Sequence, residues 1–306
     1  MDLPNDDALR FIVSTYARLR AAHGESIGDP TLLQPTADFF PDEFRSDAPS
    51  VARLLRRMIG YAPVADDLTV ELALLAPEEP LAGGCGSLAC GSSGGTDANA
   101  LEAQQLDGGY RVSVPVTHLG NPDVLTASLA RSVGAIVLHE AGEPGEGKTS
   151  EIAAVMCGFG VLLANGAAIW GKSCGGLRMV QATVLTVDEL AVALAIFAAV
   201  HRRKASQARE HFGATQREAF DLAHDWVESN PMLIDVLRAR PAMLEAGLFD
   251  MEPVRGALGR WLHKRRQERH ARAEAAPSPP PMTDEKRRRL EEAKALVDEV
   301  FGEADV

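Results

Sequence analysis

One long apolar stretch near the middle of the chain restricts the possible folds more than any other feature. Residues 152–171 contain no charged side chain, so they must be shielded from water in a protein core or a membrane. Most of them belong to a predicted helix pair over residues 125–165, whose two helices are joined by a short turn rich in glycine and proline. Gly158, Gly160, Gly166 and Asn165 weaken the hydrophobicity of the stretch. We therefore expect a buried core helix and no membrane span.

The composition agrees with a soluble globular protein, because 46% of the 306 residues are hydrophobic and 24% are charged. The formal net charge of −12 argues against general nucleic-acid binding. The first seven residues are acidic and contain no apolar signal segment. Four cysteines are too few for a secreted fold held together by disulfides. These observations predict a cytoplasmic location.

Helical periodicity dominates the chain, so the predicted fold class is α+β and predominantly α-helical. Apolar spacing predicts helices at residues 6–23, 50–61, 122–142, 150–170, 188–203, 215–228, 232–239 and 253–275. Gly24 is expected to stop the first of them. Alternation predicts strands at residues 68–75 and 110–116, which form a small hairpin or sheet. Turns are expected at residues 171–181, and an irregular segment at residues 31–44 is expected to pack down through its aromatic side chains.

The predicted main domain covers residues 1–275 and contains a Gly-rich insertion at residues 81–109. We interpret the insertion as a long flexible loop or one arm of a hairpin. Residues 276–282 form a Pro-rich linker, and residues 283–306 form an amphipathic tail helix. Its apolar stripe consists of Leu290, Ala293, Leu296, Val297, Val300 and Phe301.

Two segments near the C-terminus suggest contacts with other molecules. A tethered amphipathic helix is suited to fill a groove of a partner, so Leu290, Leu296, Val297, Val300 and Phe301 are candidate partner-binding residues; packing on the chain's own domain is the alternative. The strongly basic residues 260–272 are interpreted as a solvated helix end. Binding of an acidic protein or RNA is the alternative for them.

The turn of the helix pair contains a near-match to a zinc-peptidase motif. His139-Glu140-Ala141-Gly142-Glu143 resembles H-E-x-x-H but ends in glutamate. In H-E-x-x-H, two histidines one helical turn apart bind zinc and the glutamate activates water. An alternative metal set here is therefore His139, Glu143 and Glu151, with Glu140 as the catalytic base. Pro144 follows directly, however, which places the motif at a fraying helix end and favours a solvated pair.

The chain resembles a group of uncharacterised bacterial proteins that contain a zincin-like helix. The similarity extends from about residue 30 to residue 227. It is carried by residues 34–42, 51–61, 121–125, 158–165 and 190–197, which include Gln-Pro-Thr, Phe-Phe-Pro-Asp and Asn-Pro-Asp-Val-Leu. The resemblance implies a zincin-like helical core.

The resemblance also implies where the metal site of the family would lie. Alignment on Asn121-Pro122 places the family's H-E-x-x-H on residues 131–135, where Arg131, Ser132 and Ala135 replace both histidines and the glutamate. Glu151 falls where the family carries an acidic residue, its third ligand. The resemblance therefore implies a scaffold that has lost its metal site.

Two further motifs offer alternatives. Cys85 and Cys90 lie in the Gly-rich insertion and are interpreted as free thiols; a reversible disulfide, or a metal site completed by Cys174 and His118, is the alternative. Residues 142–149 match G-x-x-x-x-G-K-T in letters. A helix rather than a strand precedes them, which argues against nucleotide binding.

The sequence therefore favours a non-catalytic, zincin-like cytoplasmic protein that binds a partner and needs no cofactor. The first alternative is a zinc-dependent hydrolase or peptidase that uses the region of His139 and Glu140. The second is a redox or metal sensor that uses Cys85 and Cys90.

Overall fold

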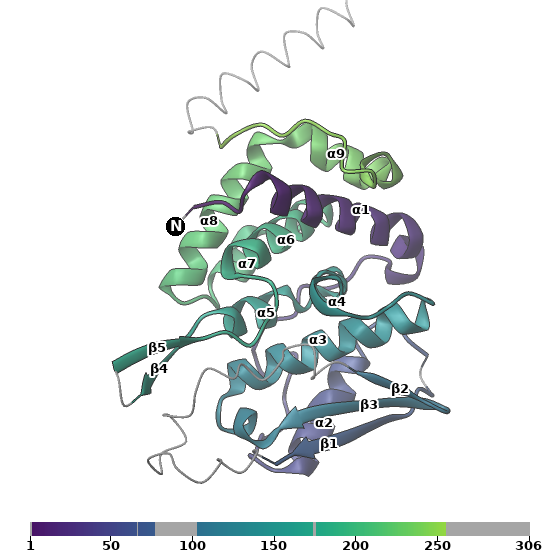
Figure 1. The fold of residues 1–306 in the computed structure, drawn as a ribbon, viewed down its shortest axis with the longest axis vertical. Helices are drawn as coiled ribbons and strands as arrows, with labels where there is room; N and C mark the ends of the chain where they lie inside the picture. The colour runs from purple at the N-terminus through teal and green to yellow at the C-terminus, as the bar shows by residue number, and fades with distance from the viewer. Residues whose placement is uncertain (1, 66, 77–102, 174–175, 255–306) are drawn as a thin grey trace, which may run out of the picture. The chain divides into compact units, whose positions relative to one another are not determined.

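The described part of the chain is mainly α-helical and carries two small β-sheets (Figure 1). A computed structural model describes residues 2–65, 67–76, 103–173 and 176–254, which belong to one compact unit, Met1–Arg255. In chain order the elements are α1 (Asp6–Ile27), α2 (Ala48–Ile59), β1 (Val70–Leu75), β2 (Gln104–Leu106), β3 (Gly109–Pro115), the 3₁₀ helix η2 (Val116–Gly120), α3 (Pro122–Glu140), α4 (Gly147–Ala154), the π-helical segment η3 (Val155–Phe159), α5 (Gly160–Ala167), β4 (Ile169–Ser173), β5 (Gly176–Val180), α6 (Val187–Val200), α7 (Ala205–Arg209), α8 (Ala214–Ser229), α9 (Pro231–Ala239) and the 3₁₀ helix η4 (Pro241–Leu244). The predicted α+β class is confirmed.

Helix α1 shows how local signals begin and end a helix in this chain. The Asn5 side chain accepts a hydrogen bond from the amide of Ala8 at 2.9 Å, which satisfies one of the free amides of the first turn. The predicted stop at Gly24 was wrong, because α1 continues to Ile27. It ends at Gly28, whose φ is 66°, a conformation that glycine adopts at little cost.

The main sheet has the strand order β1-β3-β2. The two predicted strands are confirmed, but they pair in parallel, with Val70 opposite Tyr110 and Leu75 opposite Pro115. These two strands therefore do not form a hairpin with each other. The insertion at residues 81–109 nevertheless contributes one arm of a hairpin, as interpreted, because its strand β2 pairs antiparallel with β3. Pro115 lies at the end of β3, where its missing N–H costs no ladder hydrogen bond.

Helix α3 lies between the main sheet and most of the other helices (Figure 1). It packs against β3 and α2 on one side and against α4 and α5 on the other. Tyr110, Val112 and Val114 alternate along β3 and are buried, as expected for a strand with one covered face. The core is therefore continuous from the sheet through α3 to α6 and α8.

The predicted helix at residues 150–170 is broken into α4, η3 and α5. Gly158 has a φ of 94°, and a Cβ there would lie 2.0 Å from the carbonyl oxygen of Thr31. The amide of Leu33 also donates to the carbonyl of Gly158 at 3.0 Å. The stretch Gly147–Ala167 is long and apolar enough to cross a membrane by length and composition, yet 94% of its apolar window is buried within the protein.

The expected helix end near residue 170 and the turn at residues 171–181 were wrong. The chain leaves α5 at Ala167, and β4 pairs with β5 in an antiparallel hairpin. Ile169 and Trp170 suit a strand as well as a helix, so periodicity alone did not separate the two.

The C-terminal helices agree with the prediction. Thr186 and Glu189 form a capping box at the start of α6, and α6, α8 and α9 are confirmed. Helix α7 and η4 were not predicted. Pro253 and Val254 are not helical. The remainder of the helix predicted at residues 253–275, the basic residues 260–272, the linker and the tail helix lie outside the described residues.

Candidate functional site

The candidate site lies where α3 packs against α4. The two backbones approach closely at Gly134, because a Cβ there would lie 2.1 Å from the carbonyl oxygen of Ser150 and 2.9 Å from the Cβ of Ala154. A larger residue at this position would push the helices apart. The contact encloses polar side chains of both helices away from solvent.

Two fully buried charged side chains face each other at this contact, and we call them the buried centre. Arg131 from α3 and Glu151 from α4 are both 0% exposed, and Nη1 of Arg131 lies 3.9 Å from Oε1 of Glu151. The two carboxyl oxygens of Glu151 also accept hydrogen bonds from the amides of Val184 and Leu185, each at 2.7 Å. The carboxyl group is therefore held in place by two consecutive amides of the segment that leads into α6.

Burial away from solvent shifts the pKa values of the titratable side chains at and near the buried centre. Burial raises the pKa of Glu151 to about 7, although the two amide donors and the charge of Arg131 lower it. Burial also lowers the pKa of His118, and the charge of Arg131 lowers it further. Nδ1 of His118 lies 3.1 Å from Oγ of Ser128. Arginine cannot lose its proton in a protein, so Arg131 is the permanent cation of the group.

The residues at the position of the implied metal site do not fit a zinc ion. Arg131 is a cation and offers no lone pair to a metal. Oγ of Ser132 donates to the carbonyl of Ser128 at 3.1 Å, and Ala135 carries only a methyl group. Zinc in proteins takes thiolate, imidazole and carboxylate ligands, and of these the position retains only Glu151.

The near-zinc motif lies at the C-terminal end of α3, and its side chains have separate partners. The ring of His139 stacks on that of Tyr110, with 6.0 Å between centroids and 23° between planes. The hydroxyl of Tyr110 donates to Oε1 of Glu140 at 2.8 Å. Burial raises the pKa of Tyr110 to about 12, and the hydrogen bond to Glu140 adds to this.

Glu143 belongs to a third group, the helix-end cluster of Arg18, His23 and Glu143. Arg18 donates to one carboxylate oxygen, and Nε2 of His23 lies 2.7 Å from the other. Partial burial alone would raise the pKa of Glu143, but the hydrogen bonds and charges of Arg18 and His23 together lower it. This carboxylate is occupied by two cationic or polar groups of α1.

The structure therefore does not bring His139, Glu143 and Glu151 together as one set of ligands. Among the described residues, the group of three or more potential ligands whose atoms lie within 4.8 Å of one another is His224, Asp225 and Glu228 on α8. This group was not predicted from the sequence. It is partly exposed, and no further feature of the described residues around it indicates a ligand.

The other motifs divide between described and undescribed parts of the chain. Cys85, Cys90 and Cys174 lie outside the described residues. Cys157 is a free, buried thiol, and burial raises its pKa to about 12. In the G-x-x-x-x-G-K-T match, Nζ of Lys148 lies 2.6 Å from Oε1 of Glu189, so this lysine has a carboxylate partner.

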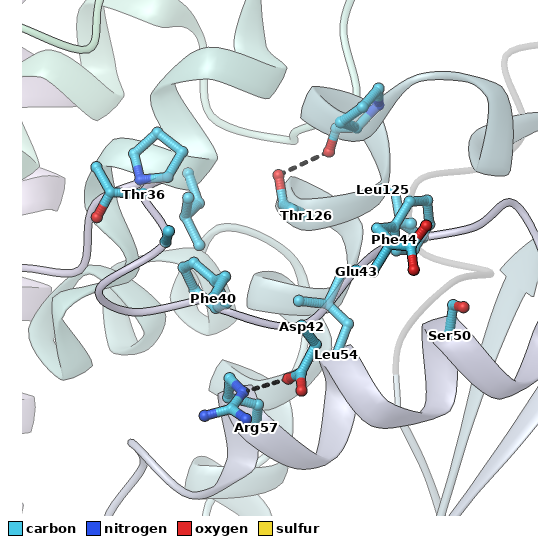
Figure 2. Close-up of a pocket in the computed structure, with 14 residues that line it drawn as sticks. Thr36, Phe40, Asp42, Glu43, Phe44, Ser50, Leu54, Arg57, Leu125 and Thr126 are labelled. Atoms are coloured by element: carbon cyan, nitrogen blue, oxygen red, sulfur yellow. Dashed lines mark hydrogen bonds and ion pairs between the residues drawn. The ribbon is translucent and has the colours of Figure 1, made fainter.

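A second candidate site is an apolar pocket of about 320 Å³ between residues 35–44, α2 and the first turns of α3 (Figure 2). Its lining is mostly apolar, with an ion pair at one end: Pro35, Thr36, Ala37, Phe40, Asp42, Glu43, Phe44, Ser50, Leu54, Arg57, Pro122, Leu125, Thr126 and Leu162. Residues 31–44 were expected to pack against the protein, but a pocket was not predicted. The aromatic residues of that segment were its only signal in the sequence.

Comparisons with known proteins assign neither site. No protein-family model, no curated protein and no solved structure matches the chain. The resemblance to bacterial zincin-like proteins therefore stays a prediction from the sequence, and the function must be argued from the geometry of the chain itself.

Proposed function

We propose that this chain is a non-catalytic protein with a zincin-like scaffold, which acts by binding a partner. The observation that carries the proposal is the buried centre. Glu151 occupies the implied position of the third metal ligand, and Arg131 occupies that of the first histidine. Their side chains lie 3.9 Å apart and are 0% exposed.

The chemistry of the pair explains how such a scaffold remains folded without a metal. A buried carboxyl group requires hydrogen bonds or a positive charge nearby. Val184 and Leu185 supply the hydrogen bonds, and Arg131 supplies the charge. A guanidinium cannot activate a water molecule as a Lewis acid does, so this arrangement supports a structural role.

The alternatives have less support. A zinc-dependent hydrolase would need His139, Glu143 and Glu151 on one ion, but these three do not form a group of ligands among the described residues, and Glu143 contacts Arg18 and His23. A sensor built on Cys85 and Cys90 would use residues outside the described part of the chain. The tail helix with Leu290, Leu296, Val297, Val300 and Phe301 also lies there, and it remains the predicted partner contact. The cytoplasmic location remains a prediction from composition.

Metal analysis of the purified full-length chain tests the proposal. We expect far less than one zinc ion per chain after incubation with zinc and gel filtration. The double variant Arg131→His/Ala135→His should gain about one zinc ion, because it returns two imidazoles one helical turn apart beside Glu151. Adding Glu151→Ala should remove this ion. Circular dichroism on each variant shows whether the helices are retained.

The outcomes separate the two parts of the proposal. Stoichiometric zinc in the unaltered chain that is lost in His139→Ala would overturn the non-catalytic assignment in favour of the hydrolase. A folded Arg131→His/Ala135→His variant without zinc would contradict the zincin-like geometry. If that variant does not fold, Arg131→His alone tests the same point, because it should raise the affinity for zinc above that of the unaltered chain.

A further inference from the structure

The apolar pocket of Figure 2 lies next to a second hollow along α2. This hollow, which we call the arginine hollow, has a volume of about 380 Å³ and is lined by Asp42, Arg53, Arg56, Arg57, Gly60 and Tyr61. It shares Asp42 and Arg57 with the apolar pocket. The two hollows therefore adjoin each other at the ion pair of Asp42 and Arg57, and we call them together the groove, which is apolar at one end and lined by arginines at the other.

The irregular wall of the groove is fixed to α2 by specific contacts. Nε of Arg57 donates to Oδ2 of Asp42 at 2.7 Å, which is the ion pair drawn in Figure 2. The hydroxyl of Tyr61 donates to the carbonyl of Phe39 at 2.9 Å. The Tyr61 ring packs edge-on against Phe39 and Phe40, with centroids 6.1 and 6.3 Å apart. A wall held in this way lowers the entropy lost when a ligand binds.

The apolar end is shaped to receive a hydrophobic side chain. Its base contains Leu125 and Leu162, both 1% exposed, whereas Phe44 is 38% exposed. The volume of about 320 Å³ is near the lower limit of the roughly 300–1,000 Å³ typical of ligand sites. This size suits one or two side chains of a peptide better than a cofactor.

The charges of the groove favour an acidic ligand. Asp42 is paired with Arg57 at 2.7 Å and Glu43 with Arg45 at 3.6 Å. Arg53 and Arg56 are exposed, and within the described ranges neither has a carboxylate at ion-pair distance. Arg53 instead donates to Oγ of Ser50 at 2.9 Å. The charge of Arg53 contributes to lowering the pKa of Asp47, but neither arginine forms an ion pair with a described residue. On a chain with a net charge of −12, the two exposed arginines form a local positive surface.

We propose that this groove binds a partner protein through a linear peptide in which a hydrophobic anchor lies next to acidic residues. The anchor fills the apolar pocket, and the acidic side chains pair with Arg53 and Arg56. Arginine binds carboxylates with two parallel hydrogen bonds, which gives the contact direction and specificity. The inference rests on the binding role proposed above but not on the absence of zinc, so metal analysis and peptide binding can fail separately.

Selection from a random peptide library displayed on phage, with the full-length chain as bait, tests this inference. Enriched peptides should combine a leucine or aromatic residue with a neighbouring run of aspartate or glutamate. Fluorescence polarisation then measures their affinity for variants of the chain. Arg53→Glu/Arg56→Glu should weaken binding at least tenfold, and Phe44→Ser should weaken it severalfold. These side chains are exposed, so thermal unfolding should be little changed.

A matched control separates the local contact from the change in net charge. Lys204→Glu/Arg240→Glu alters two other exposed cations by the same total charge and should bind the peptides normally. Three results would overturn the inference. They are the absence of enriched peptides, enrichment of basic peptides, and equal binding by both charge-reversed variants. Binding of a labelled single-stranded RNA that depends on Arg53 and Arg56 would assign the groove to a nucleic acid instead.

Discussion

The buried centre and the helix-end cluster place similar side chains in opposite surroundings. Arg131 and Glu151 are 0% exposed, whereas the side chains of Arg18, His23 and Glu143 are 42%, 19% and 20% exposed. Water can replace a lost contact at the helix end, but it cannot enter the buried centre without disturbing the packing. The near-zinc motif reaches the partly exposed helix-end cluster through Glu143, while the fully buried charged groups lie at the buried centre.

The largest expected effect tests how tightly the buried centre is packed. Gly134→Ala places a methyl group 2.1 Å from the carbonyl oxygen of Ser150, so α3 and α4 must separate. We expect a loss of about 3 kcal/mol in the free energy of unfolding, measured by urea denaturation. The control is Gly24→Ala in α1, where the nearest atom is Cγ of Arg20 at 3.4 Å.

Gly24→Ala should be neutral or stabilise the chain by up to about 1 kcal/mol, because alanine favours helix more than glycine. If Gly134→Ala lowered the free energy of unfolding no more than Gly24→Ala does, the contact between α3 and α4 at Gly134 would not be tight. The buried centre would then differ little from the helix-end cluster.

The second prediction concerns the opposite pKa shifts of the two glutamates. The pKa of Glu151 is raised from 4.5 to about 7, so the folded chain holds this proton more tightly than the unfolded chain. Its contribution to stability therefore falls as the pH rises from about 4.5 to about 7. The pKa of Glu143 is lowered, so its contribution is present above the usual glutamate pKa and is lost as the pH falls.

Glu151→Gln should therefore flatten the decline of stability between about pH 4.5 and 7, by at most about 3 kcal/mol across the window. Glu143→Gln should leave that window unchanged and reduce the loss of stability on the acid side. Urea denaturation at a series of pH values measures both slopes. A decline in the Glu151→Gln variant as steep as in the unaltered chain would contradict the raised pKa.

Much of the fold could be predicted from local signals. Asn121 and Pro122 mark the start of α3, since an asparagine cap followed by proline in the first turn is a strong start signal. The alternation of apolar residues over 110–116 predicts β3, and this pattern is also local in the sequence. The end of α1 was mispredicted, because Gly24 is tolerated inside a helix at modest cost. The break at Gly158 depends on Thr31 and Leu33, which no local pattern connects to it.

The sites were harder to predict than the fold because they depend on contacts distant in sequence. The resemblance placed Arg131 and Glu151 in one implied metal site, but their burial and the amide donors from Val184 and Leu185 follow only from the packing of α3, α4 and α6. The arginines of α2 were visible in the sequence, yet their groove requires residues 35–44 to be folded against that helix. The match to the zinc-peptidase motif pointed instead to His139 and Glu143 as metal ligands, which the structure does not bring together with Glu151.

The smallest expected effect tests whether the near-zinc motif has only a structural role. Tyr110→Phe removes the hydrogen bond to Glu140 but keeps the ring that stacks on His139. Glu140 lies at the end of α3, where water can take the place of the hydroxyl. We expect a loss of about 1 kcal/mol in the free energy of unfolding. His139→Ala, which removes the stacked ring instead, should give a loss of similar size.

A loss above about 3 kcal/mol in either variant would mean that the helix end is as sensitive to substitution as the buried centre. The distinction between the two regions would then fail, because solvent access would no longer explain which contacts the fold depends on.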